Sequence, residues 1–310
     1  MKFAFPHDEL QPLSLGWADS LEELGDATRD PSSSYSGVAL TLIDALDTLG
    51  VMGNATEFTR GVSFICQNVS FDKDVRVNVF ELNIRVLGGL LSAHYLAGDQ
   101  SLGLMLGRKY DGCLLDAALD VGNRMVPAFR TSTKIPQPWI NLAKGPIRGD
   151  SRTQCTAGCG TLLLEFGLLS RLTGNSTFHT LALEALQALW SRRSSIGLLG
   201  NTLDYGTGRW QNENAGVGAG VDSFYECEHS THPRNFLIAH RCCPRPSKTC
   251  GLTCLFLGAS CSQIRAEELL SLRFARPLGD VGRSVWRSAQ VFETRAVVRS
   301  KSYADRANGP

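Results

Sequence analysis

Apolar residues recur at helical spacing through most of residues 36–226. The pattern over 36–49 predicts a helix that begins at Ser36 and ends at Gly50. Asn54 has the position and the side chain of an N-cap, which predicts the start of a second helix. The remaining predicted helices cover 77–97, 111–126, 156–173, 175–193 and the residues from 222 onward.

Two stretches between these helices lack helical periodicity. Residues 131–152 are rich in Pro, Gly and Thr and are expected to form a long loop. The Gly-rich stretch 197–220 is expected to contain short β pieces. Residues 90–99 and 168–175 form a weak internal repeat, in which an apolar helix ends at a Gly turn. Repeated helical hairpins indicate either a solenoid or a closed helical toroid, and periodicity alone does not choose between them.

Residues 79–91 form an apolar helical segment with one acid and one base. Glu81 and Arg85 are four residues apart, so they share a face of the helix. The glycine pair at 88–89 allows another element to pack closely. A charged pair inside so apolar a run must be buried and paired, or must line a pocket. From spacing alone, a structural ion pair is the simpler interpretation.

Charge and cysteine content divide the chain into two regions. Of the 310 residues, 43% are hydrophobic and 20% are charged, which is enough for one large domain or two smaller ones. The net charge is +1, but residues 1–226 carry −6 and residues 227–310 carry +7. Six of the ten cysteines lie in the second region, and the four in the first define no disulfide framework. We therefore expect a boundary near residue 226.

Three Asn-X-Ser/Thr triplets, at Asn54, Asn68 and Asn175, predict N-glycosylation sites. Such triplets also occur by chance, and Asn54 and Asn175 suit helix N-caps equally well. Together they favour a secretory-pathway protein. Residues 1–9 have no apolar core or cleavage site, so we expect no signal peptide there. No run has the length of a transmembrane span, so no membrane-spanning segment is expected.

The segment VFELNIRVLGGLLSAH at 79–94 closely resembles a signature of glycoside hydrolase family 47, the inverting α-1,2-mannosidases. Other segments carry the same resemblance: FPHDEL (5–10), LTLIDALDTL (40–49), VMGN (51–54), FDKD (71–74), CTAG (155–158), LEFG (164–167) and GVGAGVDS (216–223). The resemblance covers about 3–226 and is greatest to the endoplasmic-reticulum degradation-enhancing α-mannosidase-like branch.

The resemblance implies an all-α fold, an (α/α)7 barrel, of which residues 1–226 would form about the first half. It implies that Glu81 is a catalytic acid acting through a water and that Asp222 is a second catalytic carboxylate. It also implies that Arg85, Glu165 and Glu226 bind the sugar. An inverting glycosidase needs two carboxylates far enough apart to admit a water, and acids on separate inner helices can provide that distance. From spacing alone, Glu165 and Glu226 would be surface charges or cap partners.

The resemblance also implies a cofactor, partners and a compartment. Members of the family use Ca²⁺, held by a Thr in C-terminal hairpins that have no counterpart after Glu226. An Arg-Pro-Glu motif with a third carboxylate is likewise not found, and residues 276–278 read Arg-Pro-Leu. The implied partners are high-mannose N-glycans on misfolded glycoproteins, with oxidoreductases and other degradation factors, in the endoplasmic reticulum.

Residues 227–310 match no family known to us. Cysteines at 242–261 lie near histidines at 229–240, but their spacing fits no common zinc site. The basic residues accompany no nucleic-acid-binding motif, so no nucleic-acid partner is expected. We interpret this region as a poorly ordered tail, such as a translated intron or frameshift, rather than a genuine module.

Three functions follow for the whole chain. The first is an α-1,2-mannosidase of glycoprotein quality control, which we expect to be catalytically impaired because the third carboxylate and the calcium-binding Thr are not found. The second is a non-catalytic glycan-binding or quality-control adaptor. The third is a non-functional truncation product, in which an open toroid exposes apolar helix faces.

Overall fold

The computed structural model describes residues 3–19 and 37–231. The described residues end at 231, so the part of the predicted tail from 232 to 310 lies outside them. In chain order the helices are α1 (Leu40–Val51), α2 (Ala55–Asn68), α3 (Val79–Glu81), the π-helix η2 (Leu82–Leu87), α4 (Gly88–Gly98), the 3₁₀-helix η3 (Gln100–Leu102), α5 (Cys113–Met125), the 3₁₀-helix η4 (Val126–Phe129), α6 (Thr156–Gly160), α7 (Leu163–Thr173), α8 (Ser176–Trp190) and α9 (Asp222–Thr231).

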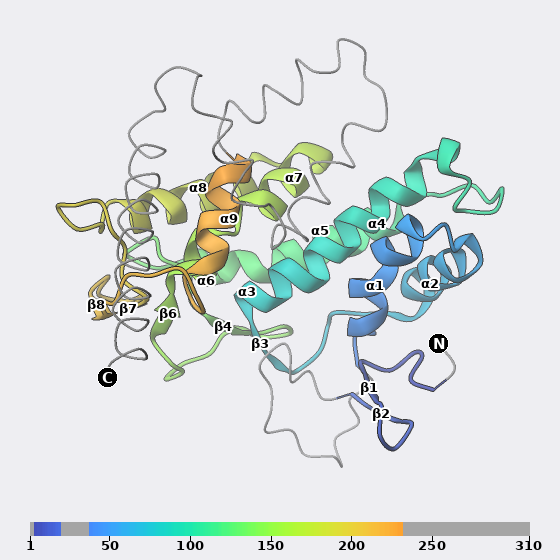
Figure 1. The fold of residues 1–310 in the computed structure, drawn as a ribbon, viewed down its shortest axis with the longest axis horizontal. Helices are drawn as coiled ribbons and strands as arrows, with labels where there is room; N and C mark the ends of the chain where they lie inside the picture. Colours follow the sequence, from blue (N-terminus) through green and yellow to red (C-terminus); the bar gives the residue numbers. More distant parts are fainter. Residues whose placement is uncertain (1–2, 20–36, 232–310) are drawn as a thin grey trace, which may run out of the picture.

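Successive helices pack as pairs, α1 with α2, α4 with α5 and α7 with α8, as the helical pattern predicted (Figure 1). The first helices of these pairs also pack side by side, α1 against α4 and α4 against α7. The last helix, α9, contacts α6 and α7. Consecutive pairs therefore pack laterally, and their first helices form one continuous row.

Helix α1 begins later than its sequence pattern predicted. It was expected to start at Ser36, which lies outside the described residues, but its first residue is Leu40. The buried carboxylate of Asp8 accepts hydrogen bonds from the backbone N–H groups of Val38 (2.8 Å) and Leu40 (3.0 Å). A side chain 30 residues away thus satisfies the donors that a local N-cap would satisfy. No local sequence pattern reveals such a cap.

The predicted cap of the second helix is confirmed. Asn54 precedes α2, and its Oδ1 accepts a hydrogen bond from the backbone N–H of Glu57 at 3.2 Å. Asn175 caps α8 in the same way, through the N–H of Thr177 at 3.1 Å. The helix predicted over 111–126 begins at Cys113, two residues late.

The central segment is not the single helix predicted over 77–97. Val77 lies in a strand, and the side chain of Asn78 accepts hydrogen bonds from the N–H groups of Phe80 and Glu81. That cap starts α3 at Val79. The helix then takes the wider π form over η2 before it continues as the α-helix α4. Apolar periodicity over so short a distance does not distinguish these helix types.

The structure contains eight short strands in the described residues, two of them in the segment 131–152 that the sequence predicted as a loop. The strands are β1 (Glu9–Gln11), β2 (Gly16–Ala18), β3 (Arg76–Asn78), β4 (Trp139–Asn141), β5 (Gly145–Pro146), β6 (Thr153–Cys155), β7 (Thr202–Asp204) and β8 (Trp210–Asn212). They form three antiparallel sheets, β1-β2, β3-β4-β5 and β6-β7-β8. The loop expected over 131–152 thus contains β4 and β5, because Ile140 pairs with Val77 across the sheet and both are buried. The short β pieces expected in 197–220 are confirmed.

The helix predicted over 156–173 is interrupted between α6 and α7. At the end of α6, Thr161 donates both its backbone N–H (3.2 Å) and its hydroxyl group (2.9 Å) to the carbonyl of Ala157. Directly before it, Gly160 packs against α9, and a Cβ atom there would lie 2.4 Å from the ring of Phe224. The break between α6 and α7 therefore lies next to the close contact between Gly160 and Phe224 of α9.

Helices α1 and α4 approach each other most closely at Gly89. A Cβ atom at this position would lie 2.8 Å from the backbone oxygen of Ile43 and 2.9 Å from its side chain. Ile43, Leu90 and Leu91 are fully buried. The close packing predicted for the glycine pair is thus confirmed at its second member.

We expect Gly89→Ala to lower the free energy of unfolding by about 1–3 kcal/mol, because the added methyl group overlaps a backbone atom that cannot move aside. Gly98→Ala is the matched control in the same helix, since a Cβ there meets nothing within 4 Å. Urea unfolding of both variants, followed by circular dichroism, measures the difference. Equal stabilities would contradict the close approach.

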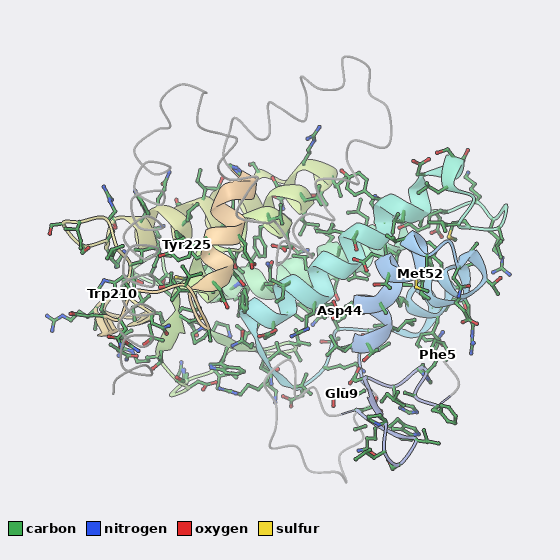
Figure 2. All side chains as sticks on the ribbon, in the orientation of Figure 1. Phe5, Glu9, Asp44, Met52, Trp210 and Tyr225 are labelled. Carbon is green, nitrogen blue, oxygen red and sulfur yellow. A yellow bond between two sulfur atoms is a disulfide. The ribbon has the colours of Figure 1, made fainter. Side chains whose placement is uncertain are left out.

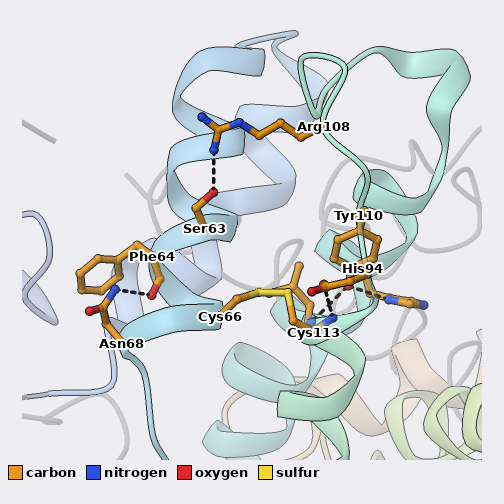
Figure 3. Close-up of a disulfide and its surroundings, with 10 residues drawn as sticks. Ser63, Phe64, Cys66, Asn68, His94, Arg108, Tyr110 and Cys113 are labelled. Carbon is orange, nitrogen blue, oxygen red and sulfur yellow. Dashed lines mark hydrogen bonds between the residues drawn. A yellow bond between two sulfur atoms is a disulfide. The ribbon is translucent and has the colours of Figure 1, made fainter.

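A disulfide joins Cys66 near the end of α2 to Cys113 at the start of α5, with 5.6 Å between the Cα atoms (Figure 3). The cysteine spacing did not predict this pair. Next to the bridge, the N–H of Leu114 donates to the hydroxyl of Tyr110 (3.1 Å), which also lies 2.9 Å from Nδ1 of His94. The bridge thus fixes α5 to α2 beside a hydrogen-bonded link to α4.

Replacing both cysteines, Cys66→Ser with Cys113→Ser, is expected to cost about 2–4 kcal/mol of unfolding free energy, because the unfolded chain loses a cross-link 47 residues long. Thermal melts with and without reductant test this. Reductant should lower the melting temperature of the wild type more than that of the double variant. An equal response in both proteins would show that this bridge carries no stability.

Candidate active site

Glu81 and Arg85 form the ion pair that their spacing predicted. Arg85 Nε donates to Glu81 Oε2 at 2.9 Å, and Arg85 Nη1 lies 3.5 Å from Asp44 Oδ2 on α1. The side chains are partly exposed, at 28% for Glu81 and 31% for Arg85. The pair was expected either to be a structural ion pair or to line a pocket. Both interpretations are compatible with the structure, because the ion pair is also accessible to solvent. Asp44, which the sequence did not single out, extends it to a second helix.

A cleft of about 230 Å³ lies beside this pair, between β1 and α1. It is lined by Glu9, Leu40, Thr41, Asp44, Ala45, Thr48 and Arg85. Figure 2 labels two of these residues, Glu9 at the hairpin and Asp44 on α1. The exposed face of α1 is polar there, because Thr41, Asp44 and Thr48 recur at helical spacing. That polar stripe in an apolar helix was the sequence signal for this cleft.

Glu165 lies on the other side of η2 and is not the surface charge that its spacing alone suggested. Its Oε2 accepts a hydrogen bond from Nδ2 of the buried Asn83 at 2.7 Å. Its Cγ would lie 3.7 Å from a Cβ at Gly88. Burial raises the pKa of Glu165 to about 7. This carboxyl group is therefore poised between its charged and neutral forms near neutral pH.

Asp222 is the first residue of α9, and its Oδ1 accepts a hydrogen bond from the N–H of Ser223 at 2.9 Å. Cys155, which lies directly before α6, is within electrostatic reach of both Asp222 and Glu81. Burial raises the pKa of Cys155, and the negative charges of Glu81 and Asp222 raise it further. Since α6, which follows Cys155, packs against both α3 and α9, the two carboxylates approach this thiol from different helices.

Glu226 lies four residues after Asp222 on α9 and is exposed. Glu81 and Arg85 are thus directly paired, and Asp222 shares the neighbourhood of Cys155 with Glu81. Glu165 instead contacts Asn83. The predicted residues therefore lie along one row of packed helices, with Glu165 facing a different side of η2 from the ion pair.

The three predicted glycosylation sites are all exposed, as attachment of a glycan requires. Asn54 and Asn175 use Oδ1 to cap helices, while Nδ2 of Asn68 donates to the carbonyl of Phe64 at 3.0 Å. Both functions of the cap asparagines are compatible, because a glycan is attached through Nδ2. Their modification stays a prediction.

Within residues 3–19 and 37–231, no three His, Cys, Asp or Glu side chains are grouped to hold a metal ion. We assign no step to the calcium ion that the resemblance implies. None of the described helices is both long and apolar enough to cross a membrane.

The family model of Glycosyl hydrolase family 47 matches residues 1–231. Alpha-mannosidase I MNS5 of Arabidopsis thaliana is 51% identical over 227 residues, which cover 73% of this chain and 39% of that protein. ER degradation-enhancing alpha-mannosidase-like protein 2 of Homo sapiens is 45% identical over 223 residues, covering 72% of this chain and 36% of the relative.

The fold is also that of a solved enzyme. The structure of alpha-1,2-mannosidase from Trichoderma reesei matches with a TM-score of 0.63 and 29% identity, over 76% of this chain and 47% of that chain. The predicted helical barrel is thus confirmed as a partial domain, and the chain spans less than half the length of these relatives. On the match of residues 1–231 and these identities, the chain belongs to glycosyl hydrolase family 47.

Proposed function

We propose that this chain acts on high-mannose N-glycans as an α-1,2-mannosidase-like protein of glycoprotein quality control. The observation that carries the proposal is the position of Glu81 and Asp222. They come from α3 and α9, which both pack against α6, and Glu81 adjoins the polar cleft through Arg85. Two carboxylates on separate elements are the arrangement that inversion at a sugar carbon requires.

In this proposal the residues have distinct tasks. Glu81 delivers a proton through a water to the departing glycosidic oxygen, and Arg85 fixes the orientation of that carboxylate by a hydrogen bond of 2.9 Å. Asp222 is the second carboxylate on the opposite side. Glu165 and Glu226 bind sugar hydroxyls.

A secretory compartment is part of the proposal. The bridge between Cys66 and Cys113 belongs to an oxidising environment, and the three exposed sequons suit the same one. Curated relatives are named ER degradation-enhancing proteins, which supports the endoplasmic reticulum for this chain. Misfolded glycoproteins, oxidoreductases and degradation factors are the partners this location implies.

The proposal includes low turnover for residues 1–310, in which no Arg-Pro-Glu motif supplies the third carboxylate. The alternative is an adaptor that binds the glycan without cleaving it. A third possibility, a non-functional fragment, predicted exposed apolar helix faces. Among the described residues, the face of α1 that lines the cleft is polar at Thr41, Asp44 and Thr48, whereas Val51 at the end of the same helix is apolar and 62% exposed. That face favours a surface that binds a polar ligand.

Glu81→Gln is expected to reduce mannose release from a high-mannose glycopeptide by about 10²–10⁴-fold, because the proton donor is lost. Release is measured by mass spectrometry of the glycopeptide during long incubation with the full chain. Glu213→Gln, at an exposed position of the Gly-rich stretch, is the control and should leave release unchanged. Equal release by Glu81→Gln and wild type would refute the assignment. Binding of the glycopeptide with no release by either protein would identify the adaptor instead.

Glu165→Gln is expected to reduce the pH dependence of stability. The folded-state pKa of Glu165 is about 7, above the ordinary value of 4.5, so the folded state holds the proton more tightly. This stabilisation is complete below pH 4.5 and is lost as the pH rises through 7. Between pH 5 and pH 8 the melting temperature should therefore fall more for the wild type than for Glu165→Gln.

The control for this measurement is again Glu213→Gln, which should follow the wild type. Gln can still accept the hydrogen bond from Asn83, so the variant isolates the titration from the contact. Parallel pH profiles for Glu165→Gln and the wild type would show that this carboxyl group does not titrate in the range.

A further inference from the structure

Arginine and aromatic side chains gather around β7, β8 and the end of α8, at the opposite end of the molecule from α1 and β1 (Figure 1). The aromatic rings pack against a small hydrophobic core that includes Leu189 and Leu203, and each of them stays partly exposed. The arginines lie beside these rings and are exposed. This arginine–aromatic surface consists of Arg152, Arg193, Arg209, Trp190, Tyr205 and Trp210.

Hydrogen bonds join the two segments that carry most of this surface. Nε1 of Trp210 donates to the backbone carbonyl of Arg192 at 3.0 Å. In return, Nε of Arg192 donates to the carbonyl of Gly208 at 3.2 Å. The end of α8 is therefore fixed to the turn between β7 and β8. Arg193 and Arg209, which adjoin these bonds, belong to one continuous region of the surface.

The positive charge of the surface is only partly balanced. Arg152 Nη2 lies 3.1 Å from Oδ1 of Asp204 and forms an ion pair. The guanidinium group of Arg193 lies 4.7 Å from the centroid of the Trp190 ring and donates to a backbone carbonyl. Within the described residues, neither Arg193 nor Arg209 has a carboxylate partner. Arginine and tryptophan are enriched among the residues that dominate protein–protein binding, so this composition suits a protein partner.

Strand β8 adds a second binding feature to the surface. Among the described residues it pairs with β7 on one side only, so it lies at an edge of its sheet. An edge strand presents backbone N–H and C=O groups with which an extended peptide can pair. Arg209 directly precedes β8, and the exposed Glu213 follows its other end. A peptide paired with β8 would therefore have its acidic residues at the Arg209 end.

We propose that the arginine–aromatic surface and the free edge of β8 form a docking site for an extended acidic segment of a partner protein. Its carboxylates pair with Arg193 and Arg209, and its backbone pairs with β8. The basic region 227–310 of this chain carries +7, the same sign as the surface, so it does not supply the complementary charge. The site lies away from Glu81 and the cleft, so it goes beyond the proposed function and does not depend on it (Figure 1).

The test uses the full chain and a fluorescein-labelled peptide of alternating Glu and Val, with binding followed by fluorescence anisotropy. Arg193→Glu and Arg209→Glu are each expected to weaken binding about tenfold, because reversing the charge replaces attraction with repulsion. Lys109→Glu is the control, since it reverses an equally exposed charge in the segment before α5, and it should bind like the wild type. Circular dichroism verifies that each variant is folded.

A second peptide tests the pairing with β8. Alternating Glu and Pro gives the same charge but removes every second backbone N–H, so this peptide cannot form a strand ladder. It should bind about tenfold more weakly than the Glu-Val peptide, since each lost hydrogen bond weakens binding. Equal binding of the two peptides would overturn the role of the strand edge.

The remaining outcomes decide the partner and its independence from the active site. No binding of the Glu-Val peptide by the wild type, or unchanged binding in both arginine variants, would overturn the docking site. Binding of labelled oligothymidylate that depends on Arg209, with none of the peptide, would replace the acidic peptide with nucleic acid and refute the proposal. Glu81→Gln should bind the peptide like the wild type, so this proposal can stand if the proposed catalysis fails.

Discussion

The contact between Gly89 of α4 and the backbone of Ile43 in α1 determines where the charged groups of the candidate site meet. Because a glycine is required there, the two helix axes come close enough for Arg85, one turn earlier, to reach Asp44. The same approach leaves the polar stripe of α1 beside β1, where the cleft forms. Removing the close contact would separate α1 from the ion pair without changing any of the charged residues. The position of the site is thus a consequence of packing.

The π-helix η2 distributes polar groups to two sides of the central segment. The N–H of Gly88 bonds to the carbonyl of Asn83, which closes one wide turn. Both of these residues lie near Glu165, while Arg85 reaches Asp44 of α1. The apolar segment η2 can therefore contact two polar side chains, Glu165 and Asp44, because they lie on different sides of it. π-helical turns are frequent at functional sites, and here the turn places an acid of raised pKa close to an ion pair.

The sequence predicted those features of the molecule that depend on local pattern or on the family resemblance. Asn54 as a cap, the pairing of Glu81 with Arg85 and the close approach at the glycine pair all follow from spacings within one or two turns. The start of α1 was wrong because its cap is Asp8, whose contact with Val38 spans 30 residues. Glu9 was missed for the same reason, since only the folded hairpin brings it to α1. The roles of Glu81, Asp222 and the sugar-binding residues stay predictions.

The disulfide between Cys66 and Cys113 encloses the whole central segment, including Glu81, Arg85 and Gly89, in one covalent ring. A break in the exposed turn around Gly103, at the far end of α4, would divide the backbone but leave both pieces joined. The region that carries the ion pair can therefore survive a nick in the loop as a two-fragment, covalently linked unit. Only reduction together with cleavage would release it. After cleavage at that turn, the bridge would therefore still hold Glu81 and Arg85 in one covalently linked molecule.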